Sequence, residues 1–207
     1  TFGLIFKRDY ADPAVAAERR ESVVQTVLRF VLVKGNHLEQ ENPDFKREPL
    51  LPHRYTTLGP GMSAGDVNGD GLQDLFVGNA RESSGSTLFL LQADGKYIAA
   101  GSQPWKSLDA DVMGSLLFDC DGDKDLDIIY TAGDNADFTT VLKPYHGMYV
   151  FENAGGFNFK QKAFFSQNGA TKVMHGDFDG DGSSDVFWRS RTTGANELRL
   201  GAFYTMP

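Results

Sequence analysis

Five aspartates alternate with other residues in one nine-residue stretch, Asp119-Cys-Asp-Gly-Asp-Lys-Asp-Leu-Asp127. Carboxylates held this close repel one another unless a cation lies between them, so the stretch predicts a metal-binding loop. The same frame occurs twice more, as Asp66-Val-Asn-Gly-Asp-Gly-Leu-Gln-Asp74 and Asp177-Phe-Asp-Gly-Asp-Gly-Ser-Ser-Asp185. A polar turn without metal is a reasonable interpretation of one copy, but three copies in register favour a repeated ion site.

The ligand atoms in these loops predict which ion they take. Positions 1, 3, 5 and 9 of each loop offer side-chain oxygens, and position 7 offers a backbone carbonyl. Oxygen ligands suit Ca²⁺ or Mg²⁺, and one short, loosely wrapped loop favours calcium. We expect about three calcium ions in a structural role, because five protein oxygens leave little room for a substrate. The predicted ligands are Asp66, Asn68, Asp70, Leu72 and Asp74 in the first loop; Asp119, Asp121, Asp123, Asp125 and Asp127 in the second; and Asp177, Asp179, Asp181, Ser183 and Asp185 in the third.

Glycine recurs at position 4 of every loop, where the backbone must turn round the ion, and at position 6 of the first and third. The middle loop has Lys124 at position 6, and a side chain fits a left-handed turn poorly, so we expect this loop to turn differently. Position 12 holds Val77, Tyr130 and Trp188 instead of the Glu of an EF-hand. The flanking elements are therefore expected to be strands.

The stretches around the loops predict a repeated β unit. Each loop follows a short apolar stretch and precedes a strand-like one, as in a β-hairpin. A second pattern of strand, glycine turn and aromatic residue follows the first two loops, at 88–97 and 148–157. One unit is thus about four strands. Such units predict a mainly β fold of four-stranded antiparallel propeller-type blades, about three in number, which form an incomplete or partial β-propeller.

The chain before the repeats has a different character. Residues 1–35 form an N-terminal amphipathic segment, in which Asp12-Pro13 starts and Gly35 ends a predicted short helix. The alternative is a strand over 27–33, because this stretch is β-branched. Prolines make residues 36–60 an extended connector, and residues 61–207 hold the repeats. The apolar positions of the segment are Val24, Val27, Leu28, Val31 and Leu32.

Composition narrows the function classes. The chain has 207 residues, of which 41% are hydrophobic, and a net charge of -8, which argues against nucleic acid as a partner. We expect no membrane span, because no apolar run is long enough. Cys120 is the only cysteine, and it shares its position in the repeat with Val67 and Phe178. All three are expected to be buried beneath their loops.

The triple acidic loop resembles the FG-GAP/VCBS repeats of integrin-α-like β-propellers, in which such loops bind calcium between the strands of a blade. The stretch from Asp44 to His53, running into Leu58-Gly-Pro-Gly, is similar to the lead-in of these repeats in secreted members. The resemblance covers residues 36–190. It implies a secreted protein, extracellular or at the cell surface. Three loops are fewer than a closed propeller contains, so we expect that the chain is part of a longer array, that it closes differently, or that neighbouring subunits complete its exposed strand edges.

Three functions follow from this resemblance and from the absence of nucleotide, Gly-x-Ser-x-Gly and His-Glu-x-x-His motifs. The first is a calcium-rigidified module, not an enzyme, for protein interaction, adhesion or self-assembly into a homo-oligomer or filament. The second is a lectin for a glycan ligand at the cell surface. The third is an accessory domain of a secreted hydrolase using His146 or His175, although His175 is expected to be a partly buried structural residue. The sugar-stacking candidates are Trp105, Tyr145, Phe157, Phe159 and Trp188.

Overall fold

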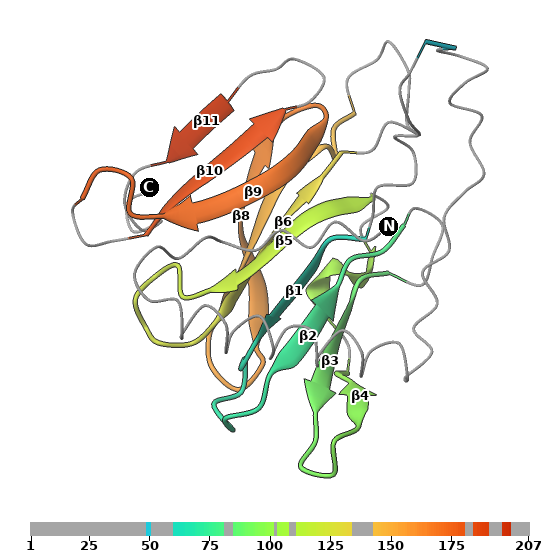
Figure 1. Cartoon of the computed structure of the whole chain (residues 1–207), viewed down its shortest axis with the longest axis vertical. Coiled ribbons are helices and arrows are strands. Elements are labelled where there is room, and N and C mark those ends of the chain that lie inside the picture. Colours follow the sequence, from blue (N-terminus) through green and yellow to red (C-terminus); the bar gives the residue numbers. More distant parts are fainter. Residues whose placement is uncertain are drawn as a thin grey trace.

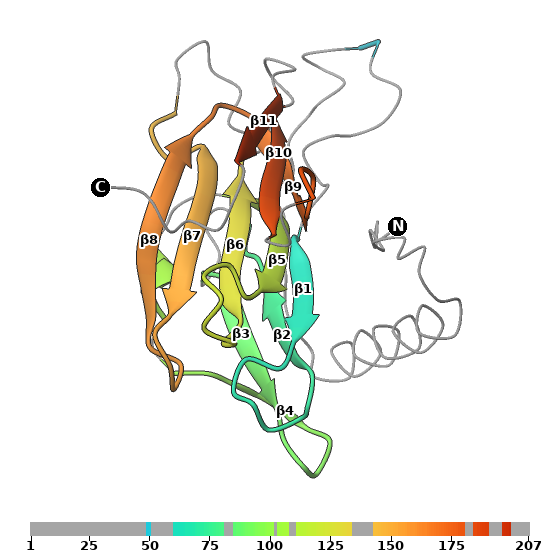
Figure 2. The same cartoon turned by 90° about the vertical axis from the view of Figure 1, so that its left-hand side faces the viewer.

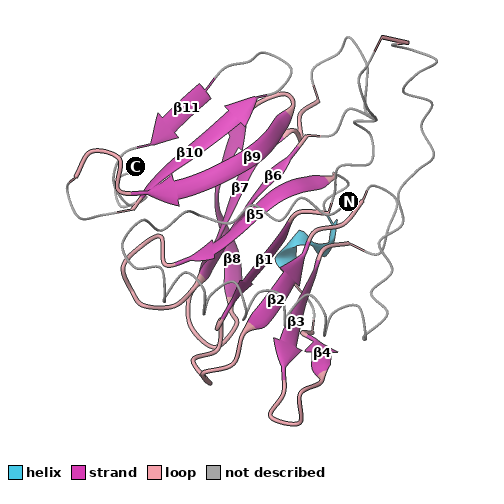
Figure 3. Cartoon of the chain, viewed as in Figure 1, coloured by secondary structure: helices cyan, strands magenta, loops and turns pink. Residues whose placement is uncertain are grey.

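The computed structural model describes residues 49–50, 60–80, 85–101, 103–107, 111–133, 143–180, 184–190 and 196–199. This part of the chain is mainly β, with eleven strands and one short 3-10 helix, and every pair of neighbouring strands is antiparallel (Figures 1 and 3). Within these ranges no helix is long and apolar enough to cross a membrane. The helix predicted in residues 1–35, and most of the connector, lie outside the described residues.

The strands form three sheets in chain order. The first is β1 (Met62–Gly65), β2 (Asp74–Val77), β3 (Thr87–Leu91) and β4 (Tyr97–Ala99). The second is β5 (Val112–Phe118), β6 (Asp127–Ala132), β7 (Gly147–Asn153) and β8 (Phe159–Ser166), preceded by the 3-10 helix η1 (Pro104–Ser107). The third contains β9 (Ala170–Gly176), β10 (Asp185–Ser190) and β11 (Asn196–Arg199) in the order β11-β10-β9. The predicted four-stranded unit is thus confirmed for the first two sheets.

The alternation of side chains along each strand gives the sheets two apolar faces. In β2, Phe76 lies in the core between the first and second sheets, whereas Leu75 and Val77 pack in a separate cluster on the opposite face. In β6, Ile128 faces the first sheet and Ile129 faces the third. Because both faces of the second sheet are covered, its strand β6 is buried along its whole length.

The first strands of the three sheets lie side by side, with β5 next to both β1 and β9 (Figure 2). Gly61 N donates to Val112 O at 2.9 Å and so links the backbones of adjacent units. A Cβ atom at Gly61 would lie only 2.9 Å from the backbone nitrogen of Gly114. Glycine is therefore required for the close approach of these units.

Candidate metal centre

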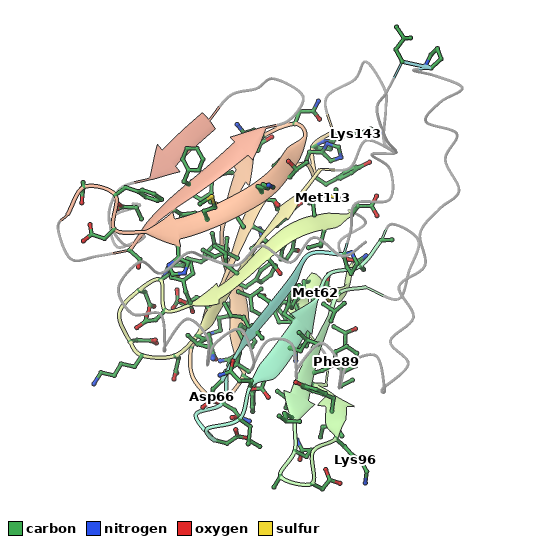
Figure 4. All side chains as sticks on the ribbon, in the orientation of Figure 1. Met62, Asp66, Phe89, Lys96, Met113 and Lys143 are labelled. Atoms are coloured by element: carbon green, nitrogen blue, oxygen red, sulfur yellow. The ribbon has the colours of Figure 1, made fainter. Side chains whose placement is uncertain are left out.

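Each acidic loop joins the first two described strands of its sheet. The strands flanking the loops pair at Gly65 with Asp74, at Phe118 with Asp127 and at Gly176 with Asp185. The predicted strand-flanked hairpins are thus confirmed, and the first of them is seen beside Asp66 in Figure 4. Two predicted ligands of the third loop, Asp181 and Ser183, lie outside the described residues.

The first aspartate of each loop organises the turn. Asp66 accepts the backbone N–H of Gly69 through Oδ1 and that of Gly71 through Oδ2, both at 2.7 Å. Asp119 accepts the N–H of Lys124 through Oδ2 at 3.0 Å, at the place that corresponds to Gly71. These bonds close the loop around the carboxylate at position 1. Equivalent bonds to position 4 join Asp119 to Gly122 and Asp177 to Gly180, both at 2.6 Å.

The expectation that Lys124 makes the second loop turn differently is wrong. Its φ is 78°, close to the 82° of Gly71 at the same position. The physical reason is that Asp119 needs an N–H donor at this position, and the left-handed backbone supplies it. The Lys124 side chain is exposed.

The last aspartate of each loop is buried, and its carboxylate accepts a backbone N–H of the same loop. We call this aspartate the clamp residue. In the second loop, Asp127 is fully buried and accepts the N–H of Cys120 through Oδ2 and that of Asn153 through Oδ1, both at 2.8 Å. Burial raises the pKa of Asp127, although these hydrogen bonds act in the opposite direction. The carboxylate therefore ties the loop to the third strand of its sheet. The same clamp joins Asp74 to Val67 and Leu91, and Asp185 accepts the N–H of Phe178.

Two loops bring three carboxylates together. Asp119, Asp121 and Asp127 each offer an oxygen within 4.8 Å of the others. Burial raises the pKa of Asp121, and the nearby carboxylates of Asp123 and Glu152 raise it further. All of these donors are hard oxygens, which fit a calcium ion. The third loop repeats the cluster with Asp177, Asp179 and Asp185.

The other predicted ligands in the described residues lie outside these two three-carboxylate clusters. Asp123 and Asp125 lie in the second loop but outside its three-carboxylate cluster, and Asp123 Oδ1 accepts the N–H of Asp125 at 2.9 Å. In the first loop, the Asn68 side-chain amide donates to Asp70 Oδ2 at 2.9 Å. The N–H of Leu72 is bound by Asp70 Oδ1 at 2.8 Å.

The aromatic residues considered for sugar stacking are mostly not surface groups. Trp105 is buried, donates its indole N–H to Ser86 O at 3.1 Å, and packs against Phe159 with ring centroids 5.2 Å apart. These two rings fill the core between the first two sheets, which corrects their assignment as sugar-binding candidates. Tyr145 and Phe157 are partly buried, and the side chain of Trp188 lies outside the described part.

The two histidines considered for catalysis, His146 and His175, have packing neighbours. His175 is partly buried, as expected, and stacks on Phe118 with ring centroids 4.5 Å apart. His146 is buried, and its Nδ1 lies 2.9 Å from Asn168 Oδ1.

Two features of the loops were not predicted from the sequence: the hydrogen bonds made by the last aspartate and the exposure of Phe178. The buried clamp of Asp74, Asp127 and Asp185 was not recognised, although each of these residues is the first residue of an apolar strand, which was a usable signal. Phe178 is half exposed, whereas Val67 and Cys120 at the same position are buried as expected. The expectation for Phe178 was wrong because burial at this position depends on the next sheet.

The described part of the chain is therefore a mainly β repeat protein with an acidic loop between the first two strands of each sheet. The chain belongs to the FG-GAP-like repeat family, whose model matches residues 66–130 and 119–188, more than half of its length. This confirms the resemblance seen in the loops. No curated protein matches the chain. Repeats of this family suggest a protein-interaction module.

Proposed function

We propose that this chain is an extracellular interaction module in which calcium ions rigidify the acidic loops. The observation that carries the proposal is the convergence of Asp119, Asp121 and Asp127 within 4.8 Å, repeated at Asp177, Asp179 and Asp185. Carboxylates this close are stabilised by a divalent cation between them. The family match supports the interaction role.

Calcium has a structural role in this proposal. The clamp residue Asp127 contacts both its loop and the third strand of its sheet, so an ion bound to it reinforces an existing connection to the core. The residues proposed to hold the ions are those at positions 1, 3, 5, 7 and 9 of each loop. The sheets would stack as propeller-type blades, which the side-by-side strands β1, β5 and β9 support.

The interaction role is favoured over the two alternatives. A lectin would need exposed aromatic rings, and the burial of Trp105 and Phe159 removes two of its candidates. The non-enzymatic role is proposed because His146 and His175 are accounted for by packing contacts. The ligand of the module is proposed to be a protein at the cell surface.

Thermal unfolding tests the proposed calcium role. The full chain would be stripped of metal and melted alone, with calcium and with an equal concentration of magnesium. Calcium should raise the midpoint because it binds the folded state only, and magnesium should raise it much less because it demands a tight octahedron. Equal midpoints in all three conditions would refute the proposal.

A further inference from the structure

Asn153, the last residue of β7, connects the first acidic loop to the second. Its side chain is buried, and its backbone N–H donates to the clamp residue Asp127 of the second loop at 2.8 Å. Its side-chain Nδ2 donates to Val67 O in the first loop at 3.3 Å. The same Nδ2 donates to Leu126 O in the second loop at 3.4 Å. One buried residue therefore holds backbone groups of both loops.

In the first loop, Asn153 is connected to the carboxylates at both ends. The Val67 N–H donates to the clamp residue Asp74 at 3.1 Å. The peptide group between Val67 and Asn68 accepts the Asn153 amide at its carbonyl. The N–H of this same peptide group donates to Asp66 Oδ1 at 3.3 Å. Hydrogen bonds in series polarise one another, so the position of Asn153 affects the carboxylates at positions 1 and 9 of the first loop.

Leu126 gives the two loops a second contact. A Cβ atom at Gly65 would lie 2.6 Å from Leu126 Cδ1, so the leucine side chain packs directly against this glycine. Gly65 precedes Asp66, the first residue of the first loop, and Leu126 precedes the clamp residue of the second loop. The end of the second loop thus lies against the start of the first, and the Asn153 amide holds the carbonyl of the same leucine.

The first sheet shows that a clamp does not need an asparagine as its partner. Leu91 occupies the equivalent place in β3, because its N–H donates to the clamp residue Asp74 at 2.9 Å. Its side chain packs in an apolar cluster. Burying an amide costs free energy unless hydrogen bonds compensate, and the bonds of the Asn153 amide go to the two loops. The side chain of Asn153 therefore serves the connection between loops.

We infer that Asn153 is a positioning residue that couples the first and second acidic loops, so that ordering of one loop favours ordering of the other. This coupling belongs to the hydrogen bonds of the chain itself. Its consequence for metal binding rests on the proposed function: calcium in the second loop should raise the calcium affinity of the first about fivefold, within the usual range of coupling between sites. Linkage makes the effect on the second loop equal.

Calcium titration of the full chain tests this consequence, with NMR signals of the Gly71 and Lys124 amides reporting on the first and second loops separately. Asp121→Ala should abolish binding in the second loop and weaken binding in the first about fivefold. Asn153→Leu introduces the residue type that the first sheet has at this place. In the Asn153→Leu background, Asp121→Ala should change the affinity of the first loop by less than about twofold.

The matched control is Val150→Ala, which separates coupling from a general loss of stability. Val150 lies on the same strand β7 and is fully buried, but it packs in the core between the second and third sheets. This substitution should lower the unfolding midpoint and leave the fivefold coupling intact. Coupling that is absent in the parent chain, that survives Asn153→Leu, or that Val150→Ala removes equally would overturn the inference.

Hydrogen exchange on the metal-stripped chain tests the connection without calcium. Asp127→Asn should speed exchange of the Gly71 amide in the first loop about fivefold, because Asn153 loses its anchor in the second loop. In the Asn153→Leu background the same substitution should leave the Gly71 rate unchanged. If this response is found in a chain that binds no calcium, the proposed function fails and the coupling stands. A Gly71 rate that ignores Asp127→Asn overturns the coupling, whatever the calcium titration gives.

Discussion

Asp127 accepts the backbone N–H of Asn153 at 2.8 Å and so connects the second acidic loop to the third strand of its sheet. Its other oxygen accepts the N–H of Cys120 within the loop. One buried carboxylate thus acts as a structural acceptor and as a member of the three-carboxylate cluster. Loop shape and sheet stability are therefore coupled before any ion binds.

Substitution of this clamp tests the coupling. In the metal-stripped chain, Asp127→Asn should lower the free energy of unfolding by about 1–3 kcal/mol, because one buried backbone N–H loses its acceptor. Asp123→Asn is the matched control, since Asp123 lies in the same loop but is exposed. Denaturant titration should show a much smaller effect for the control. Equal effects of the two substitutions would contradict the clamp.

The first loop should bind calcium most weakly. It has three carboxylates, because Asn68 stands at the position where the other two loops have an aspartate. The Asn68 side-chain amide donates to Asp70 and adds no negative charge. Asn68→Asp should therefore tighten the weakest calcium site, since affinity rises with ligand charge. Gln73→Glu adds the same charge at an exposed position that is not a predicted ligand and should have little effect. Calorimetry in which the two variants behave alike would count against the ligand assignment.

Acid should remove the stabilisation by calcium. Burial raises the pKa of Asp121 and Asp127 above the ordinary 3.8, so the folded metal-free chain takes up protons more readily than the unfolded chain. These two groups make the metal-free protein more stable as pH falls through their raised pKa toward 3.8. Protonated carboxylates do not ligate, so calcium must displace these protons and its apparent affinity falls over the same range.

The difference between unfolding midpoints with calcium and without metal should thus shrink as pH falls from neutrality. Metal-stripped protein is the proper reference, because chelators also lose affinity in acid. A difference that stays constant down to the ordinary carboxyl pKa would show that these carboxylates do not hold the ion.

The local pattern predicted much of the fold. An apolar stretch, an acidic turn and a second apolar stretch indicated the hairpins that end at Asp74, Asp127 and Asp185, because these features depend on neighbouring residues only. Burial of Val67 and Cys120 followed from the same pattern.

Tertiary context explains what the sequence did not predict. Phe178 has the same local sequence frame as Cys120, but the described residues contain no further sheet over it, so its exposure depends on the stacking of units. Trp105 lies on the isolated helix η1, with no repeat to assign it to a face, and only the assembled core shows that it is buried. The left-handed turn at Lys124 has a local cause, because its N–H donates to Asp119 five residues earlier in the same loop.

Direct calcium binding to the metal-stripped full chain tests the central claim most directly. Calorimetric titration should give saturable binding of about three ions, one for each acidic loop. Asp121→Ala should remove about one of them, because Asp121 belongs to the cluster of the second loop. An absence of saturable calcium binding at millimolar concentrations, or a stoichiometry that Asp121→Ala leaves unchanged, would contradict the account.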